Sequence, residues 1–380
     1  MGLLKIGAVR NWGRGGMTEL ITIDEDTDEY FFSRNWTDGL PVVAPTVDKV
    51  NKMLDAVQLE SSVVLGEVAE RSRQLTAEKA AINAVMAGCK PEYFPIVVAA
   101  LSAMLDPAYN AHTALTSTGG AATCVLVSGP MASEIGMRSK HNVLGAGNRA
   151  NLTIGRALRL VAANVFGART GDMDGSSIGH PGKISMCFAE NDPEEFWSPL
   201  RTELGYSVED TTVTVFASEG PRQVANHLNP DPVGILNTFA TAMRCPSTFS
   251  VGKGAEVILI LGPEHSSVLI DGRWSRDRVR EYLAEHSRVS PQELSDAGIL
   301  LEHGSQHDKG VGADGKFATV PGPEDIYIVT AGGAGAGWSA YIPSWAPKIH
   351  SRAVTRKVSI GGNMADLFCD DACAIPQRNG

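Results

Sequence analysis

Short apolar segments that end in glycine-rich turns constrain the fold of this chain more than any other feature. Four of them are residues 124–127, 211–217, 257–261 and 326–330. Gly-Pro follows three of these segments, at Gly129, Gly220 and Gly262, and a run of glycines follows the fourth. A buried strand, a glycine turn and a helix form the repeating unit of α/β folds, which bind ligands along their strand ends. The pattern therefore predicts an α/β protein. The recurrence also suggests a weak internal duplication, although Gly-Pro is a common turn sequence in unrelated proteins.

The length of 380 residues accommodates two domains of ordinary size. We predict two intimately packed lobes built from units of strand, glycine turn and helix. The predicted divisions are an N-terminal extension (1–34), a first lobe (35–205), a second lobe (206–356) and a C-terminal arm (357–380). Residues 1–16 differ from the acidic segment that begins at Met17, so we assign them no role in the fold.

The composition excludes several classes of partner. Hydrophobic residues make up 43% of the chain and charged residues 20%, as in globular proteins. The net charge is −10 and long runs of Lys and Arg are absent from the sequence, so we expect no nucleic-acid partner. The most apolar stretch, residues 94–105, is shorter than the roughly 20 residues that span a bilayer, so we expect no membrane partner. The chain has six cysteines and no recognisable signal peptide, which favours a cytoplasmic protein with reduced thiols. We also expect an oligomer of like or unlike chains.

Capping residues predict several helices. Thr46, Thr76 and Ser275 each precede a segment with apolar residues at helical spacing, which favours helices that begin at the next residue. Gly88 ends the second of these helices, and Pro91 begins another after a two-residue turn.

Cys89 occupies that turn and is the best candidate for a reactive thiol. The neighbouring Lys90 and the start of the helix at Pro91 would both lower the pKa of the thiol. The alternative is that Cys89 is a small buried core residue. Cys124 and Cys187 lie in apolar segments and are expected in the core.

Residues 167–183 form a long polar loop, and loops of this length inside a compact domain are usually functional. The loop ends in Gly-His-Pro-Gly-Lys, which makes His180 the best histidine candidate and Lys183 a partner for a carboxylate or phosphate. His265 directly follows a predicted strand and, with Glu264, is a second candidate for a general base. A structural turn and a helix cap are the respective alternatives.

Residues 145–151, Gly-Ala-Gly-Asn-Arg-Ala-Asn, offer backbone N–H groups and Arg149 at the start of a predicted helix, a combination suited to an anion. The segment is not a dinucleotide-binding fingerprint. The glycines at 332–337 do not precede a phosphate-binding helix, and P-loop and HExxH motifs are absent from the sequence.

Acidic side chains in glycine-rich turns complete the set of candidates. Asp38 and Glu219 are candidates for substrate binding, and Asp172 and Asp174 resemble half of a metal-binding loop. A divalent metal is thus an open alternative, and we expect no other cofactor.

Five segments of this sequence together resemble a bacterial family of unassigned function. These segments are NWTDGLPVV, NAVMAGCKPEYFP, GNRANLTIGRALRL, GHPGK and GPEH, spread over most of residues 35–345. The family is associated with small proteins bearing a UGSC or CGSC motif, which are similar to the selenocysteine subunit of glycine reductase. The resemblance implies a partner that carries a reactive thiol or selenol. It also implies that the site includes Cys89, Asn148, Arg149, Arg156, His180 and Lys183.

Three functions follow as hypotheses. The first is an enzyme subunit, of lyase or reductase type, that uses Cys89 in reductive or eliminative cleavage of a carbon–heteroatom bond of a small anionic substrate. In it, His180 or His265 is the acid–base group and Arg149 with Lys183 holds the anion. The second is a metal-assisted hydrolase or lyase that uses Asp172, Asp174 and His180. The third is a non-catalytic binding or assembly subunit for a thiol or selenol partner.

Overall fold

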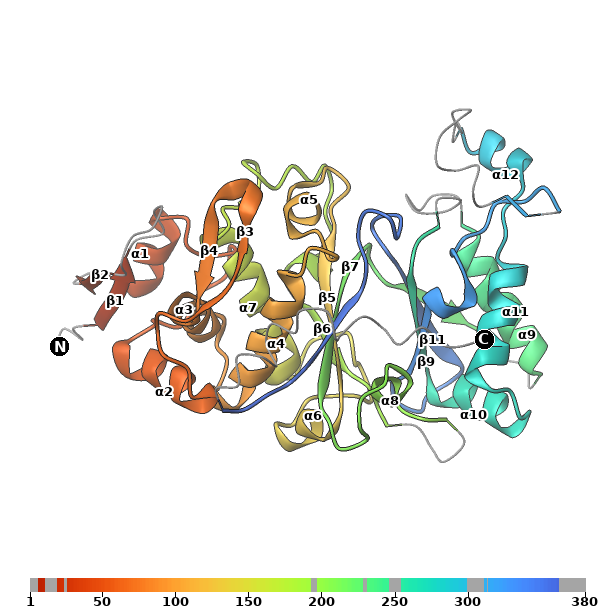
Figure 1. The fold of residues 1–380 in the computed structure, drawn as a ribbon, viewed down its shortest axis with the longest axis horizontal. Coiled ribbons are helices and arrows are strands. Elements are labelled where there is room, and N and C mark those ends of the chain that lie inside the picture. The colour runs from red at the N-terminus through yellow and green to blue at the C-terminus, as the bar shows by residue number, and fades with distance from the viewer. Residues whose placement is uncertain are drawn as a thin grey trace.

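The computed structural model describes residues 6–10, 19–23, 26–192, 197–227, 231–245, 254–298, 311–312 and 314–361. Two mixed four-stranded sheets lie in the middle of the molecule, and helices cover the outer face of each sheet (Figure 1). The combination of helices with mixed sheets is consistent with the α/β class predicted from the sequence. In the described part of the chain, no helix is both long and apolar enough to cross a membrane.

The first sheet has the strand order β12-β7-β5-β6. Its strands are β5 (Ala122–Ser128), β6 (Met186–Ala189), β7 (Thr212–Ser218) and β12 (Val354–Lys357). β5 and β6 are parallel, whereas β7 is antiparallel to both β5 and β12. α4 (Phe94–Met104) and α7 (Arg149–Asn164) pack on its outer face. α2 (Val47–Val57) and α3 (Ala77–Ala87) pack against these helices, farther from the sheet.

The second sheet has the order β10-β9-β11-β8 and repeats the same set of directions. Its strands are β8 (Arg222–Ala225), β9 (Val257–Leu261), β10 (Ile326–Thr330) and β11 (Trp338–Pro343). β9 and β10 are parallel, and β11 is antiparallel to both β9 and β8. Its outer face carries α9 (Pro232–Met243), α10 (Pro263–Asp271) and α11 (Arg276–His286).

The chain crosses between the sheets twice. β7 lies in the first sheet and leads directly into β8 in the second, whereas β11 of the second sheet leads back to β12 in the first. Ser218 and Ser344 form an antiparallel bridge where these two crossings meet. A division of the chain near residue 206 therefore does not separate the sheets, because β7 pairs along its full length with β5.

Alternation of side chains along the strands explains the layers, because successive residues of a strand point to opposite faces. Cys124 and Leu126 of β5 pack with Ile258 and Ile260 of β9 in a core between the two sheets. Val125 and Val127, which point to the opposite face of β5, pack instead against the helices on the outer face. Each sheet is thus buried on both faces.

Three helices that were predicted from their capping residues are confirmed with their predicted first residues. α2, α3 and α11 begin directly after Thr46, Thr76 and Ser275, and the last two of these side chains accept a hydrogen bond from the third residue of the helix. Gly88 ends α3 in the left-handed conformation with φ +94°. Pro91 begins a 3₁₀ turn, η2 (Pro91–Tyr93), before α4.

The predicted extension over residues 1–34 contains structure. β1 (Ile6–Arg10) pairs with β2 (Glu19–Ile23), although we assigned residues 1–16 no role in the fold. α1 (Thr27–Ser33) buries Tyr30 and Phe31 in the core around Trp36, so this part of the expected extension belongs to the folded body. Most of the predicted C-terminal arm, from residue 362 onward, lies outside the described residues.

The strand and glycine-turn pattern leads to a helix in two of its four occurrences. α6 (Pro130–Glu134) follows β5, and α10 follows β9. The turns after β7 and β10 lead instead into strands β8 and β11, which corrects the expectation of a helix after each. Gly129 has φ +135°, and a Cβ there would collide with the Asp210 carbonyl oxygen, so only glycine fits.

Smaller elements connect the layers. They are β3 (Val64–Val68), β4 (Arg73–Thr76), α5 (Ala111–Thr116), α8 (Leu200–Glu203), α12 (Pro291–Asp296), and the 3₁₀ turns η1 (Ala69–Arg71), η3 (Pro181–Lys183) and η5 (Pro323–Asp325).

Candidate functional site

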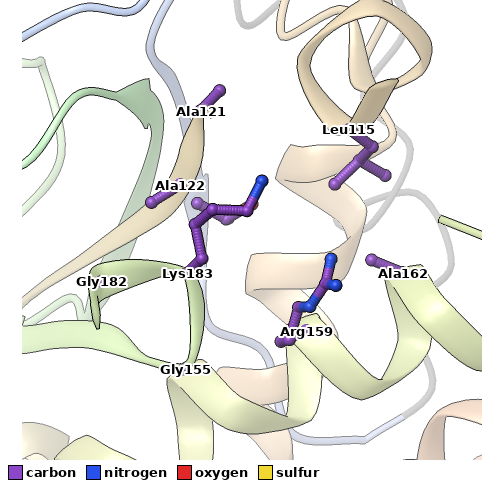
Figure 2. A pocket seen from close by; sticks show the side chains of 9 residues that line it. Leu115, Ala121, Ala122, Gly155, Arg159, Ala162, Gly182 and Lys183 are labelled. Atoms are coloured by element: carbon purple, nitrogen blue, oxygen red, sulfur yellow. The ribbon is translucent and has the colours of Figure 1, made fainter. Parts of the chain in front are cut away.

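A cavity lies at the amino end of β5, between that strand and α7. Its walls are formed by Leu115, Ala121, Ala122, Thr123, Gly155, Arg159, Ala162, Gly182 and Lys183. Its volume is about 20 Å³, slightly more than the roughly 10–15 Å³ that one water needs. Figure 2 shows Arg159 reaching from α7, and Lys183 from the η3 turn, toward the same space beside Leu115. Most other residues of the wall are small, and its charged groups are Arg159 and Lys183.

Both cations share one buried carboxylate. Lys183 Nζ lies 3.0 Å from Asp174 Oδ1, and Arg159 Nη1 lies 3.2 Å from Asp174 Oδ2. The Asp174 side chain is 1% exposed, and each cationic side chain is 14% exposed. Hydrogen bonds and the two cations lower the pKa of Asp174 despite its burial, so the carboxylate is ionised at neutral pH. While Lys183 is protonated, the cluster of Arg159, Lys183 and Asp174, the cationic cluster, therefore carries one unit of excess positive charge.

Hydroxyl groups adjoin the cationic cluster. Lys183 Nζ donates a hydrogen bond of 2.6 Å to Ser176 Oγ, which in turn donates one of 2.5 Å to Asp174 Oδ1. Thr123 Oγ1, in the wall of the cavity, shares a hydrogen bond of 2.8 Å with the hydroxyl of Tyr109. Burial lowers the pKa of Lys183, and the nearby Arg159 lowers it further. Lys183 is thus closer to losing its proton than an exposed lysine.

His180 lies at the start of the same η3 turn but not in the wall of the cavity. A Cβ on Gly220 would lie 3.4 Å from His180 Nδ1, so the imidazole packs against the turn between β7 and β8. Burial lowers the pKa of His180, and the charge of Lys183 lowers it further. Its Nε2 is buried without a hydrogen-bond partner. Glu219 belongs to the neighbouring turn and faces Arg222 across 3.9 Å. His180, Lys183 and Glu219 are therefore brought to the same end of the first sheet.

Cys89 lies in a different part of the first half, between α3 and α7. Its side chain is buried, and Sγ donates a hydrogen bond of 3.2 Å to the Thr153 carbonyl oxygen. Burial raises the pKa of Cys89 to about 12, although Arg149 and Arg156 act in the opposite direction. The lowered pKa predicted from Lys90 and the helix start is wrong because desolvation outweighs those charges. The alternative, a small buried core residue, describes its surroundings better.

Arg156 and Arg149 hold segments of the fold together. Arg156 binds Asp38 through two hydrogen bonds of 2.8 and 2.7 Å and thereby attaches the loop before α2 to α7. Arg149 donates to the Gly88 carbonyl oxygen over 2.9 Å. Asn148 caps α7 by accepting from the Asn151 backbone N–H over 3.0 Å. These contacts use the groups that we expected to bind an anion at the start of α7.

Lys90 is exposed and forms an ion pair of 3.4 Å with Glu92. His265 lies in the second half, where its Nδ1 is 2.7 Å from Ser339 Oγ and its Nε2 is 3.1 Å from the Asn226 carbonyl oxygen. The imidazole is 1% exposed and burial lowers its pKa. The structure thus places neither Lys90 nor His265 with Lys183.

The acidic loop does not assemble a metal site. Within the described ranges, no group of three or more His, Cys, Asp or Glu side chains is arranged to hold a metal ion. Asp172 is exposed, whereas Asp174 is already paired with two cations. A divalent metal would have to approach the carboxylate against those two charges.

Sequence reasoning missed Arg159 and Ser176. Arg159 lies three residues after Arg156 on α7, and the spacing gave no reason to choose the later arginine. Ser176 lies in the loop that we predicted to be functional, but its hydroxyl had no distinguishing motif.

A second cavity, of about 100 Å³, lies at the carboxyl ends of β9 and β10. Its walls include Asp192, Ser266, Ser267 and Thr330, and its carboxylate, Asp192, is paired with Arg201 at 2.7 Å. The charges of Asp192 and Arg201 cancel, so this pair provides no excess positive charge. The cavity beside the cationic cluster therefore favours anions more than the second cavity does.

No model of a known protein family matches the chain, and no curated protein matches its sequence.

Proposed function

We propose that this protein is an enzyme subunit that binds a small anionic substrate in the cavity at the amino end of β5 and cleaves a carbon–heteroatom bond in it. Arg159 holds the anionic group, and Lys183 exchanges a proton with the reacting part of the substrate. A carboxylate is the substrate group that fits best, because the planar guanidinium of Arg159 matches it in shape and charge.

The observation that carries this proposal is the excess charge of the cationic cluster. Two cations, each 14% exposed, share the single carboxylate of Asp174 beside a cavity. Partly buried like charges are unfavourable unless a counter-charge compensates them, and a bound anion supplies it. The cavity holds little more than one water in this conformation, so a substrate has to widen it.

Lys183 is suited to proton transfer because its lowered pKa makes the unprotonated amine form more readily than in an exposed lysine. Burial and Arg159 lower its pKa, whereas Asp174 raises it. The guanidinium of Arg159 stays charged, so Asp174 keeps a counter-ion when Lys183 releases its proton. General acid–base groups work best when their pKa lies near the working pH.

The thiol-dependent part of our first hypothesis is not retained. Burial raises the pKa of Cys89 to about 12, which keeps the thiol protonated at neutral pH. Cys89, at the turn after α3, is also not among the residues that form the wall of the cavity. We therefore propose that the bond is cleaved without a thiol of this region.

Calorimetric titration with malonate, a small dicarboxylate, tests the proposal. We expect saturable binding to the wild type. In Arg159→Gln the affinity falls about tenfold or more, as for the loss of a charge-assisted hydrogen bond. Arg149→Gln is the matched control, because Arg149 lies on the same helix but contacts Gly88. Absence of binding to the wild type, or equal affinity of the wild type and Arg159→Gln, would overturn the proposal.

We also propose that the two sheets derive from an internal duplication. The common strand order, the common set of strand directions and the Gly-Pro that follows both β5 and β9 support this proposal. In this view, the duplicated halves have exchanged their fourth strands, β8 and β12.

A further inference from the structure

We propose that Ser176 is a nucleophile that accepts an acyl group from the substrate, so that the bond cleaved is the carbonyl carbon–oxygen or carbon–nitrogen bond of an ester or amide. This inference rests on the proposed function, because it takes the anionic end of the same substrate to be held by Arg159. It adds the chemical class of the reacting group and the atom that attacks it.

The hydroxyl of Ser176 lies within reach of a base. Lys183 Nζ is 2.6 Å from Ser176 Oγ, inside the range of about 2.6–3.2 Å over which a base can take a proton from a nucleophile. Asp174 Oδ1 lies 3.0 Å from Lys183 Nζ and so orients the amine. Nucleophile, base and orienting carboxylate therefore form one connected group, the arrangement of activated hydroxyl nucleophiles.

Ser176 differs in this respect from the serine beside it. Ser176 is half-buried and its hydroxyl contacts both Lys183 and Asp174. Ser177 is exposed and contributes its backbone N–H to the Thr118 carbonyl oxygen over 3.0 Å. The two residues have the same chemistry and adjacent positions, so Ser177 is a close control for Ser176.

Two glycines leave the backbone uncovered beside Ser176. Gly120 has φ +73° and Gly179 has φ +67°. A Cβ on Gly120 would lie 3.1 Å from the Gly179 Cα and 3.7 Å from the Ser176 Cβ. A side chain at Gly120 would therefore crowd Ser176, and one at Gly179 would contact Lys183 at 3.4 Å. Glycine at both positions leaves the backbone accessible to an oxyanion that forms during acyl transfer.

The reaction conserves atoms and charge. In the first step the Ser176 Oγ attacks the carbonyl carbon, the proton of Oγ passes to the unprotonated amine of Lys183, and Lys183 then gives it to the leaving oxygen or nitrogen. A bond from Oγ to the acyl carbon has formed and the original carbon–heteroatom bond has broken. In the second step water attacks the ester, and its proton returns by way of Lys183 to Ser176. The products are a carboxylic acid and an alcohol or amine.

Covalent labelling tests this inference. A fluorophosphonate probe reacts with activated serines, releasing fluoride as the bond from Oγ to phosphorus forms. We expect mass spectrometry of the full chain after digestion to place the label on Ser176. We expect Ser177→Ala to be labelled like the wild type, Ser176→Ala to lose the label, and Lys183→Met to slow labelling at least 100-fold. The labelling rate of the wild type should rise with pH as Lys183 loses its proton.

The result separates this inference from the function on which it rests. If malonate binds to the wild type and to Ser176→Ala with equal affinity while the probe leaves Ser176 unlabelled, Ser176 is not a nucleophile and only the anion site stands. Equal labelling of Lys183→Met and the wild type would also overturn the role of Lys183. Malonate binding by Ser176→Ala shows in addition that this variant is folded.

Discussion

The amino ends of the parallel strands carry charge of opposite sign in the two sheets. At β5 and β6, the cationic cluster of Arg159, Lys183 and Asp174 has two cations for one carboxylate. At β9 and β10, Glu256 and Asp325 are two carboxylates for one cation, Lys348. We call this second group the acidic cluster.

The two clusters resolve their excess charge in different ways. Glu256 and Asp325 are each 2% exposed, and burial raises the pKa of Glu256 to about 7. Glu256 also accepts a hydrogen bond of 2.5 Å from the Ala353 backbone N–H and lies 3.4 Å from the hydroxyl of Tyr327. When Glu256 is protonated, the charges of Asp325 and Lys348 cancel and the acidic cluster has no net charge. The cationic cluster adjoins a cavity and contains Arg159, which keeps its proton, so an external anion can complete it. We therefore propose that the same position in the two sheets serves packing in one and anion binding in the other.

The largest difference should appear when the central carboxylate of each cluster is removed. Asp174→Asn leaves Arg159 and Lys183 without a counter-ion, and we expect a loss of about 3–5 kcal/mol in the free energy of unfolding. Asp325→Asn removes a like charge from beside Glu256 and leaves Lys348 free to pair with Glu256, so we expect a loss below about 2 kcal/mol. Urea unfolding at neutral pH measures both values. Equal losses in the free energy of unfolding of the two variants would contradict the opposite sign of the excess charge in the two clusters.

The acidic cluster also predicts a dependence of stability on pH. Burial raises the pKa of Glu256 from 4.5 to about 7, so the folded state binds this proton more tightly than the unfolded chain does. The stability that the proton contributes is therefore complete below about pH 4.5 and is lost as the pH rises through about 7. We expect Glu256→Gln to gain up to about 3 kcal/mol relative to the wild type between pH 4.5 and pH 8.

Unfolding of both proteins by urea at a series of pH values checks this expectation. The pKa of Glu190 is also raised to about 7 by burial, but Glu190 is present in both proteins. Its effect cancels in the difference between the two curves. A difference that does not change with pH would contradict the protonation of Glu256.

Cys89 tests whether thiol chemistry has to be added to the cationic cluster. Cys89→Ser retains a donor for the Thr153 carbonyl oxygen but places a hydroxyl in an apolar site, so we expect a loss of about 1 kcal/mol. Malonate affinity should be unchanged. Loss of binding in a folded Cys89→Ser protein would tie Cys89 to the site after all.

The smallest effect is expected at the start of α7. Arg149 donates a single exposed hydrogen bond to Gly88, so Arg149→Gln should change the free energy of unfolding by less than about 0.5 kcal/mol. Thermal unfolding of this variant beside Arg159→Gln compares two arginines of one helix. A larger effect from Arg149→Gln would place an unrecognised partner at that position.

Local signals in the sequence were sufficient for several of the central strands and longer helices. The segments 257–261 and 326–330 match β9 and β10, and the caps Thr76 and Ser275 match the starts of α3 and α11. The placement of β8 in the second sheet and of β12 in the first was not predictable, because the sequence of a four-residue strand does not determine which strand it pairs with. Gly-Pro marked the end of β7 correctly, but it did not distinguish a turn into a helix from a turn into a strand.

The site was predicted only in part. Lys183 was identified because cations in glycine-rich loops bind anions, and the structure places it in the wall of a cavity. Arg159 was not identified, because its proximity to Lys183 depends on the packing of α7 against the loop that contains Asp174. The pKa of Cys89 was predicted in the wrong direction because neighbouring residues in the sequence reveal charges but not burial.

A crystal structure of the protein soaked in malonate tests most directly whether the cationic cluster is an anion-binding site. We expect a carboxylate of malonate within hydrogen-bond distance of the Arg159 guanidinium and Lys183 Nζ, with the wall of the cavity displaced around it. A malonate bound only elsewhere, for example in the second cavity at the start of α10, would contradict the account.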